Sequence, residues 1–467
     1  MHRPFKPATT IGCHRFSISL QRYSFCRNFK ALQRTIFIHI FSFVFLSFHT
    51  NYFTQKIWHF TLKRDTFAKT DIQTTMDRKI AENIYYIGMN DRTTHRFERL
   101  WSIRRGVSYN SYVVADEKTA VIDTVEASCA EAFCKNIEAA TAGRPVDYLI
   151  VNHMEPDHSG SIATLRRRYP EMKIVGNAKT LQMITGYYGI EEGLMEVADG
   201  DTLSLGKDSL TFYMAPMVHW PETMVTYSNN TKTLFAGDAF GCFGALDGGI
   251  TDEHLLFEDY YDEMVRYYAC IVGKYGAPVQ KALQKLAPLE IKTIAPTHGP
   301  VWKRSIDKVV KVYDELSRYA AQRGVVVAYG SMYGNTASLC EEVACSLREQ
   351  GVEKIKVYDL SSADISEVLR DIFLYRGLVI ASPTYNNELF PPVRELLDSI
   401  AERTVKGRLF GFIGSYTWAS AALKRCNEMA EKHKWEVLPC AIEQKQSRLS
   451  VSDHSIENFA KQFAEAL

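Results

Sequence analysis

The sequence contains no C-x-x-C pair, although it has ten cysteines among its 467 residues. This absence excludes a zinc ribbon and a rubredoxin-type iron site, because both need such pairs. Few, unpatterned cysteines in a chain of this length are typical of a reducing compartment, where thiols stay free. We therefore expect a cytoplasmic protein with buried, unpaired thiols.

A long apolar run is also missing. The N-terminal region has one apolar stretch, Ile36–Phe48, and His39 interrupts it. A membrane-spanning helix needs about 20 apolar residues, so no stable membrane span is expected. A basic start with a short apolar stretch also occurs in signal peptides. Here, however, the stretch begins late and no small-x-small cleavage site follows it.

Net charge is almost absent, with 55 Lys and Arg against 54 Asp and Glu. This balance argues against a nucleic-acid-binding surface. The charges are unevenly distributed, because residues 1–75 contain 11 of the basic residues but only 2 of the acidic ones. From Met76 onwards the composition is ordinary for a globular protein. We predict that residues 1–75 form a poorly ordered leader outside the functional fold.

The length suits two or three domains. Residues 76–322 alternate between short strands and helices in a mixed α/β pattern, with a long helix expected over Val301–Ala321. Residues 323–467 alternate strictly between strand and helix, and the last strand is expected over Trp435–Ile442. This second pattern predicts an open, doubly wound sheet of five parallel strands with crossover helices.

Seven candidate metal ligands follow predicted strands. Four of them come directly after the apolar strand Asp147–Val151, namely His153, Glu155, Asp157 and His158. The other three each follow or adjoin another strand, namely His219, Asp238 and His298. A lone histidine is usually an ordinary core or surface residue, so the argument depends on the whole set. Seven nitrogen and oxygen donors are enough to hold two metal ions.

The pattern H-x-E-x-D-H, followed by separate His, Asp and His residues, resembles the metallo-β-lactamase superfamily. The glutamate in its second position is similar to the flavodiiron proteins. Zinc hydrolases of the superfamily usually have histidine there, whereas Glu155 provides a harder oxygen donor that favours iron. The resemblance implies an αββα sandwich with two iron ions. One iron would be held by His153, Glu155 and His219 and the other by Asp157, His158 and His298, with Asp238 as the bridge.

The second domain offers a candidate phosphate site. Its first strand leads into a turn of hydroxyl, amide and glycine residues before a helix, where backbone N–H groups and a helix N-terminus could converge on one anion. Alone, this turn fits an ordinary βα loop equally well. Two further polar loops are expected at the same sheet edge, where doubly wound sheets bind ligands. The candidate residues are Ser331, Met332, Tyr333, Gly334, Asn335, Thr336, Pro383, Thr384, Tyr385, Asn386, Ser415, Tyr416, Thr417 and Trp418.

This domain resembles flavodoxin, which implies FMN as the cofactor, flanked by an aromatic side chain such as Trp418. Met332 and Tyr333 depart from the pattern, because flavodoxins often carry smaller polar residues there. The order of the domains, a metal domain and then a flavodoxin domain, is that of the flavodiiron (A-type flavoprotein) family. The segments Gly106–Tyr112 and His219–Thr223 also resemble that family.

The resemblance implies an oxidoreductase that reduces O2 to water with four electrons, NO to N2O with two, or both. Two ferrous ions and reduced FMN together hold four electrons. No rubredoxin domain follows the second domain, so an external donor such as rubredoxin or a rubredoxin reductase system is expected. Electron transfer is expected to need a head-to-tail homodimer or a dimer of dimers. In it Trp220 would face the partner's flavin or serve as a plain interface aromatic.

Two other functions fit the sequence less well. A zinc metallo-hydrolase would use the same ligands and carry the flavodoxin domain as a passenger; iron and zinc contents separate the two. A di-iron gas or redox sensor would bind O2 without fast turnover, but the sequence shows no signalling domain. The ligands do not distinguish O2 from NO. His95 is treated as a surface residue.

Overall fold

The computed structural model describes residues 78–467. The predictions about residues 1–75, including the apolar stretch, concern a segment outside this range. Within residues 78–467, no helix is both long enough and apolar enough to cross a membrane.

The first domain contains two facing β-sheets. The larger has the strand order β1-β2-β7-β8-β9-β10-β11, and the smaller has the order β12-β13-β14-β15-β16. Tyr112 joins them, because its hydroxyl donates to the Pro296 carbonyl at 2.6 Å and its ring centroid lies 5.4 Å from that of Phe235. The larger sheet comprises Lys79–Ala81, Ile84–Tyr86, Tyr112–Ala115, Thr119–Ile122, Tyr148–Ile150, Lys173–Gly176 and Leu194–Glu196. The smaller comprises Thr202–Ser204, Ser209–Met214, Met224–Ser228, Thr233–Gly237 and Thr293–Pro296.

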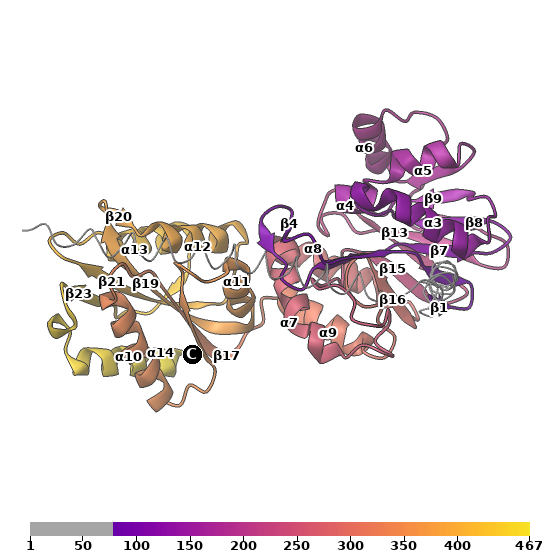
Figure 1. The fold of residues 1–467 in the computed structure, drawn as a ribbon. Helices are drawn as coiled ribbons and strands as arrows, with labels where there is room; N and C mark the ends of the chain where they lie inside the picture. The colour runs from indigo at the N-terminus through magenta and orange to yellow at the C-terminus, as the bar shows by residue number, and fades with distance from the viewer. Residues whose placement is uncertain (1–77) are drawn as a thin grey trace, which may run out of the picture. The chain divides into compact units, whose positions relative to one another are not determined.

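Helices cover both outer faces of this pair of sheets (Figure 1). On the side of the larger sheet lie α3 (Ala130–Thr141), α5 (Ile162–Arg168) and α6 (Ala178–Tyr188). On the side of the smaller sheet lie α7 (Phe257–Tyr267), α8 (Gly276–Leu286) and α9 (Ile306–Ser317). Each of α7, α8 and α9 buries one apolar stripe, as an amphipathic helix on a sheet must. The predicted αββα sandwich is confirmed.

The second domain has the strand order β18-β17-β19-β21-β22, and all of these strands are parallel. Helices α10 and α14 lie on one face of this sheet and α11, α12 and α13 on the other (Figure 1). The order is that of a flavodoxin-like doubly wound sheet, which confirms the prediction. The main strands are Gln322–Tyr329, Ile355–Asp359, Tyr375–Tyr385, Leu409–Tyr416 and Glu436–Val437. The helices are Asn335–Glu349, Ile365–Leu374, Pro391–Glu402, Ala422–His433 and Asp453–Ala466.

Two predicted elements differ from the structure. The helix expected from Val301 begins only at Ile306, because the Val301 and Trp302 N–H groups donate to the carbonyls of Ile250 and Ile294 instead. The fifth strand of the second domain is split into β22 and β23 (Ile442–Lys445). Between these two pieces the pairing with β21 slips by two residues, at a segment containing Pro439, which has no N–H to donate.

Buried arginines connect the two domains. The Arg403 guanidinium donates to the carbonyls of Ala269 and Cys270 at 2.8 and 3.2 Å. From the other side, Arg266 donates to the Ser366 hydroxyl at 2.9 Å. Such charge-assisted bonds between buried groups hold neighbouring segments in one arrangement. The chain passes between the domains from α9 to β17, next to the predicted limits at residues 322 and 323, which stay predictions.

Candidate metal centre and cofactor cleft

The candidate ligands lie where strands end. β9 leads into a loop with His153 and Glu155, and the short helix α4 (Pro156–Ser159) follows with Asp157 and His158. Three further candidates come from the smaller sheet: Asp238 directly after β15, His298 after β16, and His219 in the loop between β13 and β14. Because β15 and β16 are parallel, their carboxyl ends meet at one edge, and the structure brings all seven side chains together there.

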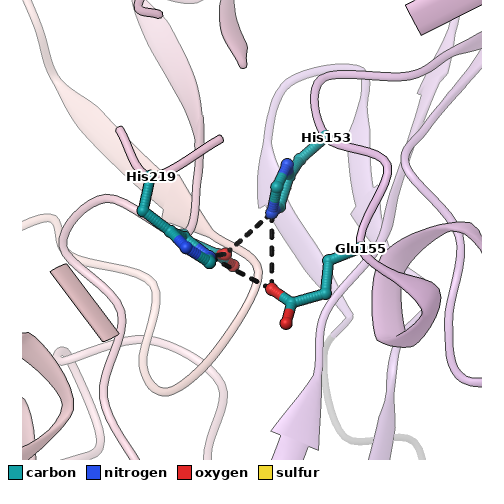
Figure 2. Close-up of side chains that lie close together, drawn as sticks. His153, Glu155 and His219 are labelled. Carbon is teal, nitrogen blue, oxygen red and sulfur yellow. Dashed lines mark hydrogen bonds and ion pairs between the residues drawn. The ribbon is translucent and has the colours of Figure 1, made fainter. Parts of the chain in front are cut away.

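Four of the seven form a compact group, His153, Glu155, His219 and Asp238, which we call the four-residue group. Their ligand atoms all lie within 4.8 Å of one another. His219 Nε2 is 3.1 Å from Glu155 Oε2 and 3.0 Å from Asp238 Oδ2, and His153 Nε2 is 3.4 Å from the same Glu155 oxygen. Figure 2 shows the two imidazoles and the Glu155 carboxylate pointing toward one another. This spacing fits a single metal ion between them.

The other three, Asp157, His158 and His298, form a second group, which we call the three-residue group, with the same compactness. His298 Nε2 lies 3.1 Å from Asp157 Oδ2. Asp238 lies between the two groups: its Oδ2 faces His219, whereas its Oδ1 is 2.8 Å from His158 Nε2. One carboxylate therefore presents one oxygen to each group, which is the arrangement that a bridging ligand needs.

Burial and neighbouring charges shift the pKa values of these side chains in opposite directions. Burial alone would lower the pKa of His158, but Asp157 and Asp238 outweigh it and raise that pKa to about 9. The pKa of His219 rises to about 9 through Asp238 and Glu155, again against the effect of burial. Burial would raise the pKa of Glu155 and Asp238, yet the neighbouring histidines hold both below their usual range. A metal ion must therefore displace imidazolium protons in order to bind.

The donors fit metal ions better than they fit one another. Both carboxylate oxygens of Asp157 and Nε2 of His298 are buried without a hydrogen-bond partner among residues 78–467, although Asp157 Oδ2 and His298 Nε2 lie close together. Buried polar atoms are nearly always hydrogen-bonded, so such exceptions need an explanation. A set of nitrogen and oxygen donors without a thiolate suits iron or zinc.

Some residues beside the centre were missed by the sequence reasoning. Glu98 lies in the hairpin of β4 (Arg96–Phe97) and β5 (Trp101–Ser102). The residue is exposed, but partial desolvation and the nearby Glu155 carboxylate raise its pKa to about 7. Tyr267 is fully buried with its ring centroid 5.6 Å from that of His298. Neither residue follows a predicted strand. The pattern that indicated the candidate ligands, a polar residue directly after a strand, therefore does not indicate these two. His95 is exposed, as expected.

Gly299 directly follows the candidate ligand His298 in the chain. Its φ of +77° is in the left-handed region, and an added Cβ would lie 2.1 Å from the Cys242 sulfur. We expect Gly299→Ala to lower the free energy of unfolding by about 2–5 kcal/mol, the sum of backbone strain and overpacking. Gly248→Ala is the matched control, because Gly248 has a φ of +81° with open space around it. Urea denaturation should show a loss of only about 1–2 kcal/mol in that control; equal losses in both would contradict the packing argument.

The second domain has a cavity of about 510 Å³ at the carboxyl ends of its strands. All the predicted cofactor residues except Gly334 line it, and Asn387, Ala419 and Gln446 line it as well. Gln446 was missed because the fifth strand was predicted as one piece that ends at Ile442, whereas β23 extends to Lys445. Tyr333 and Trp418 are each 90% exposed and mark the rim. The cavity has the size and the aromatic borders that a flat cofactor needs.

The loop before α10 is shaped by local hydrogen bonds. The Ser331 hydroxyl accepts the N–H groups of Gly334 and Ala337 at 3.1 and 3.3 Å. Gly334 has a φ of +91°, which favours glycine, and it does not itself line the cavity. Across the sheet edge, the hydroxyls of Thr336 and Ser415 lie 2.8 Å apart. A hydroxyl-rich turn at a helix N-terminus is suited to a phosphate group.

Comparison with known proteins agrees with both halves of the chain. Residues 107–299 match the family described as ODP family beta lactamase, and residues 327–451 match flavodoxin. A nitric oxide reductase of Moorella thermoacetica is 31% identical over 366 residues, covering 77% of this chain and 90% of the relative. The chain belongs to the flavodiiron proteins. The family predicted from H-x-E-x-D-H and the order of the two domains is therefore confirmed.

Solved structures of flavodiiron proteins have the same fold. The rubredoxin oxygen:oxidoreductase of Desulfovibrio gigas matches with a TM-score of 0.79 and 26% identity, covering 83% of this chain and 98% of the other. The flavodiiron protein of Giardia intestinalis matches with a TM-score of 0.79 and 26% identity, covering 84% and 96%. Flavorubredoxins are also related, such as that of Aliivibrio fischeri, which is 30% identical over 74% of this chain and 71% of the relative.

Proposed function

We propose that this flavodiiron protein is an oxidoreductase that reduces O2 to water, NO to N2O, or both, with two iron ions and FMN as its cofactors. The observation that carries the proposal is the position of Asp238, with one oxygen at each of two groups of metal-type ligands. The cavity in the flavodoxin domain of the same chain adds a place for the flavin. Relatives named nitric oxide reductase and rubredoxin oxygen:oxidoreductase support both substrates.

Each ligand group has a defined task in this proposal. His153, Glu155 and His219 would hold one iron and the three-residue group the other, with Asp238 between them. When bound, the ferrous ions and the reduced flavin supply the electrons for reduction of the diatomic gas. Glu155 would give the first iron an oxygen ligand. This suits iron better than the histidine that zinc hydrolases usually have at the same position.

The protein around the irons keeps water away and holds a proton nearby. The rings of Phe97, Tyr109 and Tyr267 surround His298, with centroid distances of 5.2, 5.9 and 5.6 Å. Burial, together with the Asp238 carboxylate, raises the pKa of the Tyr267 hydroxyl well above its ordinary value, so this group stays protonated. A buried hydroxyl beside a reacting gas molecule is suited to donate a hydrogen bond as negative charge develops.

We also propose an external electron donor, such as rubredoxin or a rubredoxin reductase system, and a head-to-tail homodimer or dimer of dimers. The exposed Tyr333 and Trp418 at the rim of the cofactor cavity support contact with another protein, because exposed aromatic residues are enriched at interfaces. Buried contacts such as those of Arg403 and Arg266 restrain the domains of one chain, which supports transfer to a neighbouring chain. All eight cysteines within residues 78–467 are unpaired, which supports a cytoplasmic location.

The test is anaerobic reduction of purified protein followed by turnover of O2 and NO side by side. Metal and FMN contents should be close to two irons and one flavin per chain, with gas consumption and, for NO, N2O formation. A zinc hydrolase would contain zinc and consume neither gas. A sensor would bind a gas without sustained consumption. Binding without turnover, or a zinc-loaded preparation, would end the reductase proposal.

As the pH rises, the affinity for iron should increase, whereas the stability of the metal-free protein should decrease. The pKa values of His158 and His219 are about 9 in the folded protein against 6.5 as their ordinary value. The stability that their protonation adds is complete below pH 6.5 and is lost as the pH rises through 9. Over the same range the affinity for Fe²⁺ should increase by about tenfold per pH unit for each proton displaced. Anaerobic calorimetry and urea denaturation check this; a flat affinity between pH 6.5 and 9 would contradict it.

A further inference from the structure

Glu222 links two histidines of the four-residue group. It lies three residues after His219 in the loop between β13 and β14 and is only 1% exposed. Its Oε1 lies 2.8 Å from Nδ1 of His153 and accepts the Met154 N–H at 3.0 Å. The Asn177 amide also donates to the Glu222 carbonyl at 2.6 Å, which fixes the backbone of this loop. One residue therefore belongs to the loop of one histidine and contacts the ring of the other.

These contacts determine which ring nitrogen of His153 carries the proton. The Met154 N–H can only donate, so Oε1 of Glu222 acts as an acceptor. His153 Nδ1, which approaches the same oxygen, must then be the donor. When a metal ion displaces the second proton of the ring, the lone pair is therefore on Nε2, the atom that points at Glu155 and Asp238 in the four-residue group. Figure 2 shows His153 in this orientation toward the group.

The three-residue group has weaker support behind its rings. Nδ1 of His298 lies 2.7 Å from the Ser108 carbonyl, which is a neutral acceptor. Nδ1 of His158 has no hydrogen-bond partner within the described part of the chain. A carboxylate behind a histidine makes it a stronger ligand than a carbonyl does, because it stabilises the charge that develops on the ring. The two groups are therefore unequal in their second layer of contacts.

We infer that Glu222 is a positioning residue that fixes the ring of His153 and makes the four-residue group the tighter of the two metal sites. The inference rests on the proposed function, since it assumes that both groups hold a metal. It also predicts an order of loading: the four-residue group fills first and the three-residue group second.

The experiment is a stepwise anaerobic titration of metal-free full-length protein with Co²⁺, followed by its visible absorption, and then with Fe²⁺. Wild type should bind two ions in two resolved steps. Glu222→Ala should weaken the first step by ~10–100-fold and leave the second within about threefold. Glu222→Gln keeps an oxygen acceptor without the charge, so it should weaken the first step less than alanine does. Thr223→Val is the matched control, because the Thr223 hydroxyl contacts the Trp220 N–H of the same loop and not His153.

The outcomes separate this inference from the proposed function. If wild type binds no metal at these residues, the proposed function fails. If wild type binds two ions and Glu222→Ala titrates like wild type, or loses both steps equally, Glu222 has no selective role and the inference is wrong. The same holds if Thr223→Val weakens the first step as much as Glu222→Ala does. Should the alanine variant not fold, Glu222→Gln decides: selective weakening of the first step supports the inference, and an unchanged first step overturns it.

Discussion

Replacing Asp238 by alanine is expected to lower iron content from two ions toward none and to reduce turnover of O2 and NO by more than about 100-fold. Loss of a partner behind a ligand already costs ~10–100-fold, and Asp238 contributes one oxygen to each group. Metal analysis and gas consumption by the same preparation check the expectation.

Two further variants make this result specific. Asp238→Asn keeps the shape and an oxygen that can accept the Thr297 hydroxyl, which lies 2.6 Å from Asp238 Oδ1, but it loses the charge. It should therefore fold and still lose metal. Asp208→Asn is the control, because Asp208 is equally buried in the same domain and accepts the Ser228 hydroxyl. A preparation of Asp238→Asn with two irons and wild-type turnover would show that Asp238 does not bridge.

The sequence could predict the seven candidate ligands because their signal is local. Four of them lie within six residues after an apolar strand, and the other three adjoin strand ends. Parallel strands of one sheet end at a common edge, so a residue that directly follows such a strand is expected at that edge. The structure brings all seven together, and their role as ligands stays a prediction until metal is measured.

Residues that act from loops and hairpins could not be predicted in this way. Glu222 is visible in the sequence only as part of His219–Thr223, and nothing there indicates that its carboxylate reaches back to a ring 69 positions earlier. Glu98 belongs to a hairpin of two-residue strands, too short to show any alternation of apolar and polar residues. Tertiary packing alone brings these carboxylates to the centre.

The errors in element boundaries have a similar origin. Val301 and Trp302 are apolar and precede a true helix, so periodicity alone extends the helix to include them. In the folded chain the Val301 N–H donates to the carbonyl of Ile250, which is far away in sequence, and the Trp302 N–H donates to that of Ile294 in β16. The split of the fifth strand depends on a two-residue slip against β21, which only the partner strand reveals.

Replacing Asn335 by aspartate should weaken FMN binding in the cavity without damaging the domain. Asn335 is the first residue of α10 and lines the cavity, where the proposed FMN would place its phosphate. Two like charges about 4 Å apart repel by about 4 kcal/mol at an effective dielectric constant of 20. Half of that amount would weaken FMN binding ~30-fold. Flavin content and fluorescence titration of deflavinated protein measure this effect.

The same aspartate should stabilise α10, which separates loss of binding from loss of folding. A negative charge in the first turn interacts favourably with the helix dipole, by about 0.3–1 kcal/mol. Flavin-free Asn335→Asp should therefore unfold at the same temperature as flavin-free wild type or slightly higher, while its affinity for FMN falls. Asn458→Asp, at an exposed position within α14, is the control and should bind FMN as wild type does. If Asn335→Asp bound flavin as tightly as wild type does, the FMN phosphate would not lie near the N-terminus of α10.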